Sequence, residues 1–390
     1  MANRIRVTLK AEGGGSLVLR QRLSLRLRLR LRPTEYLREG ERGMDAVRKL
    51  GRMFCAVLTL VMLMAVAVST GFAAPKARVA VVFATGGLGD KSFNDSGFAG
   101  LKRAEKELGI EFQYAEPQQI AEYETLLTQF AQTRKYDLIV SIGFDQADAL
   151  KVVSAKFPNQ KFAIIDMVVD APNVASYVYK EQERGFVLGV IAGLMTTRTG
   201  DPRINPEKVI GVVGGMDIPL INANIAGYMA GARYVNPDVK VLYSYVGAWA
   251  DPAKGKELTL VQFNQGADIV WQAAGRSGLG VIKAAEETNH YAIGADSDQC
   301  YLAPKNVLTN GMKFVDNTIY TAIEQVISGK FKGGIHVLGL AEKGLGYTTS
   351  LVPADIVAKV DALAQKVISG ELAIPDKIQD VDAWLKAHKK

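Results

Sequence analysis

Acidic and amide side chains stand directly after short apolar runs in this sequence. Asp90 and Asn94 follow the run 78–84, Asp166 ends the segment KFAIID, and Asp296 ends YAIGAD. An ionised carboxylate accepts up to four hydrogen bonds, so an acid in such a place can bind both hydroxyl groups of a vicinal diol. We therefore expect a hydroxylated ligand, although each acid taken alone could also form a turn or cap a helix.

Other residues that could contact a ligand also follow or end apolar runs. Trp249 follows LYSYVGAW, the pair Gly275-Arg276 follows IVWQAAGR, and Lys313 lies in VLTNGMK at the start of a predicted helix. An indole supplies a stacking surface for a flat ring, and a glycine lets the backbone approach a ligand closely. Trp249 could equally pack in a core, and Lys313 could be solvated on its helix. The placement of all these residues after strands favours one shared cleft.

The elements that must position these residues alternate between strand and helix. Short runs rich in β-branched residues indicate strands buried on both faces, and segments of ten to fifteen residues between them indicate helices. Predicted strands cover 78–84, 111–115, 137–142, 161–165 and 174–178, then 209–213, 240–245, 268–271 and 291–294. Predicted helices cover 95–108, 120–133, 146–156, 181–197, 221–234, 252–265 and 278–287. This alternation predicts parallel sheets with right-handed crossovers, whose ligands bind beyond the carboxyl ends of the strands.

Two such sets of strands predict an α/β protein with two doubly wound lobes. We assign residues 75–180 and 311–333 to the first lobe, and residues 181–310 and 334–390 to the second. The chain would cross between the lobes near 173–185, 305–310 and 333–340, with a helix at 312–328 returning to the first lobe. Three short crossings predict lobes that hinge.

The first 73 residues are expected to lie outside the fold. Met44 begins a secretory signal, with basic residues at 48–52, an apolar stretch at 54–68 and cleavage after Ala73. Residues 1–43 precede this complete signal, so we interpret them as an over-extended or disordered leader. Cys55 lacks the small residues that precede the cysteine of a lipoprotein signal. The sequence thus predicts a periplasmic protein, with a membrane-associated lipoprotein form as the alternative.

Charge argues against a nucleic-acid partner. Residues 1–73 hold 14 of the 47 Lys and Arg residues and 5 of the 40 Asp and Glu residues, which leaves 33 basic and 35 acidic residues in the mature chain. The basic isoelectric point of the whole chain therefore arises from the leader, and it gives no sign of a basic surface on the mature chain. A dinucleotide fingerprint is also incomplete, because Ser92 stands where the third glycine of GxGxxG would follow Gly87 and Gly89. We expect no cofactor.

Signals of an enzyme are weak. The three histidines, His290, His336 and His388, lie far apart and in no metal-binding spacing, and no GxSxG or Walker motif occurs. Asp296 and Asp298 are too few acids for a convincing metal site. After signal cleavage Cys300 is the remaining cysteine, and we interpret it as a small, partly buried residue. We expect no catalytic residue and no metal.

Six ordered motifs carry a family resemblance. They are GDKSFND, then KFAIID with APNV, GVVGGMDIP with Gly227-Tyr228-x-x-Gly231, GAWADPAKG, QAAGRSGLG and GADSDQ. In this combination the chain, over nearly all of 77–382, resembles the basic membrane protein family of substrate-binding proteins of ABC importers, typified by the purine nucleoside receptor A type. The resemblance implies a type I periplasmic-binding fold with three crossovers, and a nucleoside as ligand.

Carried over motif by motif, the resemblance implies ligand contacts from the residues named above and from one further aromatic residue. These are Asp90, Asn94, Phe98, Asp166, Trp249, Gly275, Asp296 and Lys313. Trp249 would stack on the base, with Phe98 as the second aromatic face, and Asp296 would bind ribose hydroxyls. The family pattern also implies a monomer that serves permease and ATPase subunits on other chains.

Two alternatives to nucleoside capture follow from the residues themselves. A sugar or other small molecule could occupy the same cleft, because aromatic rings also stack on sugar faces. A nucleoside hydrolase would need Asp296 and Asp298 to activate water or hold a metal. The absence of a convincing metal or nucleophile pattern makes the hydrolase the weaker of the two.

Overall fold

The computed structural model describes residues 51, 53 and 74–388. Residues 1–73 and 74–390 form two separate units. Apart from Gly51 and Met53, the predicted leader and signal peptide lie outside the described residues. Within the described part, no helix combines the length and apolar character needed to cross a membrane.

The first sheet of the unit 74–390 has six parallel strands in the order β11-β5-β4-β3-β1-β2. They are β1 (Arg78–Val82), β2 (Glu111–Ala115), β3 (Leu138–Ile142), β4 (Phe162–Ile165), β5 (Val174–Tyr179) and β11 (Gly334–Leu338). The apolar runs of β3 and β4 are buried along their whole length, as expected for central strands covered on both faces.

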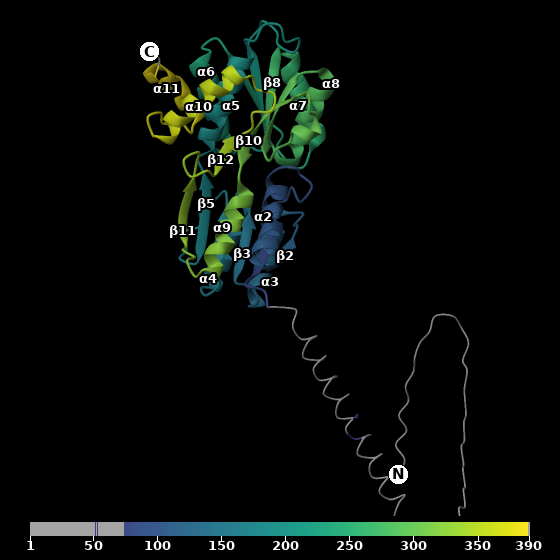
Figure 1. Cartoon of the computed structure of the whole chain (residues 1–390), viewed down its shortest axis with the longest axis vertical. Coiled ribbons are helices and arrows are strands. Elements are labelled where there is room, and N and C mark those ends of the chain that lie inside the picture. The colour runs from purple at the N-terminus through teal and green to yellow at the C-terminus, as the bar shows by residue number, and fades with distance from the viewer. Residues whose placement is uncertain (1–50, 52, 54–73, 389–390) are drawn as a thin grey trace, which may run out of the picture. The chain divides into compact units, whose positions relative to one another are not determined.

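Helices cover both faces of this sheet (Figure 1). On one face lie α2 (Phe93–Leu108) and α9 (Val315–Ile327), which pack side by side, and on the other lie α3 (Tyr123–Gln132) and α4 (Ala147–Lys156). Leu101 of α2 and Ile319 of α9 are fully buried against Val81 and Val140 of the sheet. The burial of these apolar faces holds both helices on the sheet.

The second sheet repeats this arrangement in the order β12-β10-β9-β8-β6-β7. Its strands are β6 (Val209–Gly214), β7 (Lys240–Tyr245), β8 (Ala267–Ala273), β9 (Tyr291–Asp296), β10 (Val307–Lys313) and β12 (Leu345–Tyr347). All neighbours are parallel except β12, which runs antiparallel to β10. The two sheets therefore place corresponding strands, such as β4 and β9, at corresponding positions.

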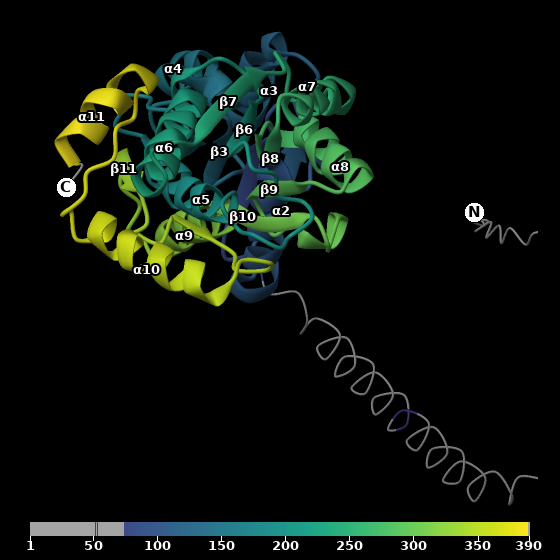
Figure 2. The same ribbon diagram turned by 90° about the horizontal axis from the view of Figure 1, so that it is seen from above.

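The helices of the second lobe also cover both faces of its sheet. One face packs against α5 (Glu181–Met195) and α6 (Pro219–Val235), and the other against α7 (Pro252–Asn264) and α8 (Gly278–Thr288), as the view from above shows (Figure 2). Two C-terminal helices, α10 (Ala354–Ile368) and α11 (Val381–His388), pack against α5 and α6 respectively.

The expected α/β fold with two lobes of parallel sheet is confirmed, and three segments connect the lobes. The chain passes from β5 to α5, from β10 to α9, and from β11 to β12. Two details differ from the sequence-based expectation. Residues 307–313 form a central strand of the second sheet, so Lys313 ends a strand instead of beginning a helix. β11, assigned from the sequence to the second lobe, pairs with β5 in the first sheet. Its exposed, edge position gives it no continuous apolar run to recognise.

Candidate ligand-binding site

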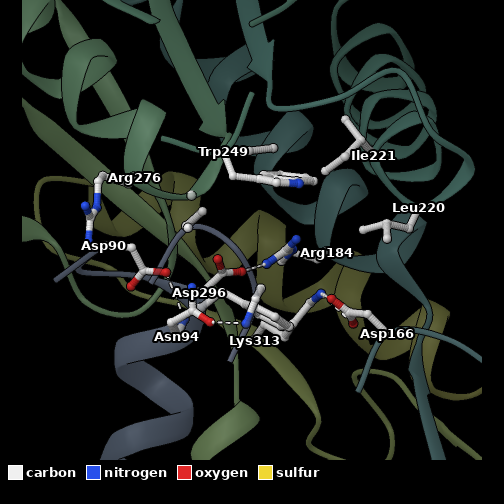
Figure 3. Close-up of a pocket in the computed structure, with 16 residues that line it drawn as sticks. Asp90, Asn94, Asp166, Arg184, Leu220, Ile221, Trp249, Arg276, Asp296 and Lys313 are labelled. Atoms are coloured by element: carbon white, nitrogen blue, oxygen red, sulfur yellow. Dashed lines mark hydrogen bonds and ion pairs between the residues drawn. The ribbon is translucent and has the colours of Figure 1, made fainter. Parts of the chain in front are cut away.

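A pocket lies between the two lobes, at the carboxyl ends of their strands (Figure 3). Seven of the eight residues predicted from the sequence line it: Asp90, Asn94, Asp166, Trp249, Gly275, Asp296 and Lys313. The other lining residues are Ala84, Gly86, Phe93, Arg184, Leu220, Ile221, Ala273, Arg276 and Ala295. Both lobes thus contribute polar, apolar and aromatic groups to one pocket.

Asp90 organises the loop between β1 and α2. Its carboxylate accepts the backbone N–H groups of Ser92, Asn94 and Asp95 at 2.9, 2.8 and 3.1 Å. The free N–H groups at a helix start favour an acceptor there. The side chain is only 1% exposed, and burial raises the pKa of Asp90 to about 6, with the three N–H groups opposing that rise. Asp90 therefore fixes the first turn of α2 at the rim of the pocket.

Asp166 and Asp296 occupy equivalent positions in the two lobes, directly after β4 and at the end of β9. Both have a left-handed backbone, with φ of 74° and 66°. This conformation is uncommon for residues other than glycine, and its occurrence at functional sites is well established. The matching turns direct two carboxylates from opposite lobes toward the same pocket (Figure 3).

A buried chain of charges connects these two acids. The Nζ of Lys313 lies 2.8 Å from both carboxylate oxygens of Asp166 and 2.5 Å from Oε1 of Glu181. The guanidinium of Arg184 lies 2.8 Å from Oε2 of Glu181 and 2.6 Å from Oδ1 of Asp296. Three acids and two bases alternate, and their side chains are between 3% and 11% exposed. Each base is shared by two acids, so neither base is left without a counter-charge.

The two pocket acids of this chain of charges titrate differently. Burial raises the pKa of Asp166 to about 6, against the attraction of Lys313. Burial would also raise the pKa of Asp296, but Arg184, Lys313 and the hydroxyl of Ser92, which donates to Asp296 Oδ2 at 2.5 Å, together hold it below its usual range. Asp296 is therefore the more firmly ionised acceptor in the pocket.

Trp249 covers the pocket from the second lobe (Figure 3). The indole sits tightly on Gly215, where an added Cβ would come within 2.3 Å of the ring. Its other neighbour, Gly275, has φ of 56°, and an added Cβ there would lie 3.7 Å from the same ring. Phe144 of the first lobe meets the indole edge to face, with centroids 6.3 Å apart. The glycines thus let the indole lie flat over the pocket.

Phe98 does not line the pocket, which differs from the expectation. Its ring packs against Phe83, Phe112 and Tyr114, with centroid distances of 6.4, 6.0 and 5.6 Å. Phe98 stands more than one turn after the start of α2, so the helix carries it away from the cleft and onto β1 and β2. Phe93, at the first position of α2, is the aromatic residue of this lobe that lines the pocket.

The two lobes also contact each other directly around the pocket. The guanidinium Nη2 of Arg276 donates to the carbonyl oxygen of Leu88, and Gln299 Nε2 donates to the carbonyl oxygen of Lys91 at 2.9 Å. The hydroxyl of Ser92 bonds to Asp296. These bonds join the loop after β1 to the loops after β8 and β9, so the lobes are closed on one another.

Two charged residues of the site, Glu181 and Arg184, were missed from the sequence. They begin the otherwise apolar helix α5 (EQERGFVLGVIAGLM), immediately after the first crossing between the lobes. The signal that could have identified them is the presence of charged residues at the start of a buried helix, next to a crossing between the lobes. Asp298, by contrast, does not line the pocket. It accepts the backbone N–H of Cys300 and the amide of Asn310, both at 3.0 Å.

The polar and aromatic groups of the pocket can hold a ligand by hydrogen bonds and by stacking. Among residues 74–388, no three His, Cys, Asp or Glu side chains are grouped so that they could hold a metal ion. The pocket offers carboxylate acceptors, two buried bases that are paired with acids, Arg184 and Lys313, and an aromatic cover. Such a site suits an uncharged ligand that has both hydroxyl groups and a flat ring.

Comparison with known proteins places the chain among transport proteins. The family model described as "Bmp: ABC transporter substrate-binding protein PnrA-like" matches residues 77–378. An uncharacterised lipoprotein of Pyrococcus abyssi is 38% identical over 286 residues, which is 70% of this chain and 69% of that protein. Basic membrane protein A of Borreliella burgdorferi is 31% identical over 329 residues, 82% of this chain and 93% of that protein.

A solved structure agrees with these matches. An ABC transporter solute-binding protein from Aeropyrum pernix is 33% identical and superimposes with a TM-score of 0.71, covering 80% of this chain and 98% of that protein. The expected two-lobed binding-protein fold is therefore confirmed, and the resemblance drawn from the six motifs is confirmed with it. The chain belongs to the Bmp family of PnrA-like ABC transporter substrate-binding proteins.

Proposed function

We propose that this substrate-binding protein captures a nucleoside with a purine base between its two lobes and delivers it to the permease of an ABC importer. The observation that carries the proposal is the position of Trp249 over a pocket that also contains Asp166 and Asp296. An aromatic cover suits a flat base, and strand-end carboxylates suit the vicinal hydroxyls of ribose.

The charges of the pocket support an uncharged ligand. Arg184 and Lys313 are both neutralised by acids, and the buried chain of charges has one more acid than base. A ligand phosphate would have to compete with carboxylates already in place at 2.6 to 2.8 Å. We therefore propose a nucleoside in preference to a nucleotide.

In this proposal each pocket residue has a stated role. Trp249 stacks on one face of the base, and Phe93 replaces Phe98 as the candidate for the opposite face. Asp296 accepts hydrogen bonds from the ribose hydroxyls. Asp166 and Lys313 lie at the far end of the same buried chain of charges. Asp90 and Asn94 bind at the rim of the first lobe, and Gly275 allows the close approach of the second. No catalytic step is assigned to any of them.

Binding and closure are coupled in this scheme. A ligand that touches both lobes stabilises the closed arrangement by the difference between its affinities for the closed and open forms. The three connecting segments at 180, 314 and 339–344 are short, which suits a hinge. The permease and ATPase are separate chains, and we expect the binding protein itself to be a monomer.

Titration calorimetry with the purified mature chain tests the proposal. The panel contains inosine, guanosine, adenosine, uridine, AMP, ribose, glucose and galactose. Saturable binding of purine nucleosides, with weaker binding of AMP and the sugars, is the expected result. Tight binding of a sugar alone would establish the sugar-binding alternative, and conversion of a nucleoside to base and ribose would establish a hydrolase.

We also propose that the chain acts outside the cytoplasm, after cleavage of the signal predicted at residues 44–73. The freely diffusing form remains a prediction, because relatives such as the Pyrococcus abyssi protein are named lipoproteins, which favours an anchored form. Metabolic labelling with radioactive palmitate distinguishes the two. N-terminal sequencing of the mature chain then locates the cleavage site.

A further inference from the structure

Two fully buried glutamines of the second lobe carry a hydrogen bond to the first lobe. Gln272 lies in β8 and Gln299 follows β9, and both residues are 0% exposed. The Nε2 of Gln272 donates to Oε1 of Gln299 at 2.8 Å. The Nε2 of Gln299 donates in turn to the carbonyl oxygen of Lys91, in the loop after β1, at 2.9 Å. Neither glutamine lines the pocket, so this connection lies outside the ligand contacts.

The orientation of both amides is fixed by backbone N–H groups of the second lobe. The N–H of Ala274 donates to Oε1 of Gln272 at 3.1 Å. The N–H of Ala295 donates to Oε1 of Gln299, also at 3.1 Å. A flipped amide would direct its NH₂ group against these donors, so each oxygen must face its N–H. The Nε2 of Gln299 is therefore held as a donor toward the first lobe by groups of its own lobe.

The acceptor in the first lobe is also fixed before the lobes meet. Lys91 has a left-handed backbone, with φ of 56°, and its N–H donates to Oδ2 of Asp95 at 3.1 Å. The N–H of Gly89 donates to Oδ1 of the same acid at 2.7 Å. Asp95 thus closes the turn around Lys91 from within the first lobe. This turn presents the carbonyl oxygen of Lys91 to Gln299.

The pocket acid Asp296 depends on the same junction. Gln299 accepts the N–H of Ala295, the residue before Asp296, and the backbone of Asp296 is left-handed with φ of 66°. The hydroxyl of Ser92, next to Lys91, donates to Oδ2 of Asp296 at 2.5 Å. The junction therefore joins the two lobes and also holds the end of the strand from which a pocket-lining acid projects.

We propose that Gln299 is a positioning residue for ligand capture, which together with Gln272 forms a latch that stabilises the closed form without touching the ligand. The donor and the acceptor are each fixed within their own lobe, so closure forms this bond without ordering either group. The latch therefore adds to the stability of the closed form whatever ligand the pocket takes. It raises the affinity for every ligand by a common factor, because a ligand leaves only after the lobes open.

The first experiment replaces Gln299 by Met, which has a similar length and no donor. The variant leaves the carbonyl oxygen of Lys91 buried without this partner only when the lobes are closed, so it penalises the closed form. Calorimetry of the mature chain should show a dissociation constant for inosine raised about tenfold, with unchanged stoichiometry. Stopped-flow tryptophan fluorescence should assign this change to faster dissociation. A damaged fold would instead lower the stoichiometry.

The matched control is Gln262→Met. Gln262 is only 3% exposed, and its Nε2 donates to the carbonyl oxygen of Val212 and to the hydroxyl of Ser244, both at 2.9 Å and both within the second lobe. The same substitution therefore removes buried hydrogen bonds from the same lobe without touching the junction. Urea unfolding should show destabilisation, while the dissociation constant for inosine should stay within about twofold of wild type.

A double-variant cycle tests whether Gln272 acts through Gln299. Gln272→Met removes one of the two donors that fix the Gln299 amide, so it should raise the dissociation constant for inosine by about threefold. Adding Gln272→Met to Gln299→Met should raise the constant no further, because the group that Gln272 orients is already absent. Additive losses would overturn the assigned connection between the two amides.

Small-angle X-ray scattering follows closure without a ligand. The ligand-free Gln299→Met chain should have a larger radius of gyration than the wild type, and Gln262→Met should have the wild-type radius. Equal radii for wild type and Gln299→Met, or an equal loss of inosine affinity in Gln299→Met and Gln262→Met, would overturn the latch. Failure of the folded wild type to bind any nucleoside would overturn the proposed function instead, and the scattering comparison would still decide this inference.

Discussion

The ammonium group of Lys313 lies 2.8 Å from both carboxylate oxygens of Asp166. Lys313 ends β10 of the second sheet, and Asp166 follows β4 of the first. One ion pair thus joins the carboxyl edges of the two sheets at the base of the cleft, beside the segment through which the chain crosses from β10 to α9. The ligand pocket and the connection between the lobes therefore share the same charged residues.

Replacement of Lys313 by Met should destabilise the protein strongly. It leaves Asp166 and Glu181 buried without that counter-charge, and the breaking of a buried pair costs about 3–5 kcal/mol. Urea unfolding measures the loss. The control is Lys208→Met, which removes an exposed pair with Asp238 and should cost less than about 1 kcal/mol. Adding Asp166→Asn to Lys313→Met should recover part of the loss, because it removes one of the buried acids left without that counter-charge. A loss in Lys313→Met as small as the loss in Lys208→Met would contradict a buried, coupled network.

Removal of the indole of Trp249 should weaken ligand binding without abolishing it. Stacking of a base on an aromatic side chain contributes about 1–3 kcal/mol, so Trp249→Ala should raise the dissociation constant for inosine accordingly, and Trp249→Phe should retain most of the affinity. Calorimetry measures both. Trp384→Ala serves as the control, because Trp384 stacks on His388 at 4.6 Å outside the pocket. An unchanged constant in Trp249→Ala would remove the stacking role.

Asp90 should make the stability of the protein depend on pH in a defined direction. Its pKa is about 6 in the folded chain and about 3.9 when unfolded, so the folded state holds the proton more tightly. The resulting stabilisation is present below pH 4 and is lost as the pH rises through 6, a change of roughly 3 kcal/mol. Unfolding free energies of wild type and Asp90→Asn at pH 4 and pH 7 test this. The advantage of wild type over the variant should shrink from pH 4 to pH 7, and an advantage that grows would refute the assignment.

The contact between α5 and α6 should not tolerate a methyl group at Gly189. An added Cβ there would come within 2.1 Å of the carbonyl oxygen of Tyr228. On an exposed helix, Gly→Ala stabilises by about 1 kcal/mol, whereas overpacking of a close contact costs about 1–3 kcal/mol or more. Gly189→Ala should therefore lower the midpoint of urea unfolding. A raised midpoint would mean that the two helices separate at little cost.

Much of this architecture could be predicted from local sequence pattern. The central strands are apolar on both faces and bounded by glycine or acidic residues, so β3, β4 and β9 were found close to their true bounds. Because parallel strands end at a common edge, the residues after them, Asp166 and Asp296 among them, could be expected in one cleft before any contact was known. The edge strand β11 was not recognised, since its largely exposed residues form no continuous apolar run.

The sequence by itself determined the alternation of strands and helices, the family, and most of the polar residues that reach the cleft. Only the tertiary structure decided which of them meet. Phe98 turned away because a helix rotates each residue by a fixed angle, and Phe93 lines the pocket in its place. Glu181 and Arg184 joined the site because they begin α5 where the chain crosses between the lobes. Local pattern reports the burial of a residue, whereas the pairing of charges depends on distances between segments that are remote in sequence.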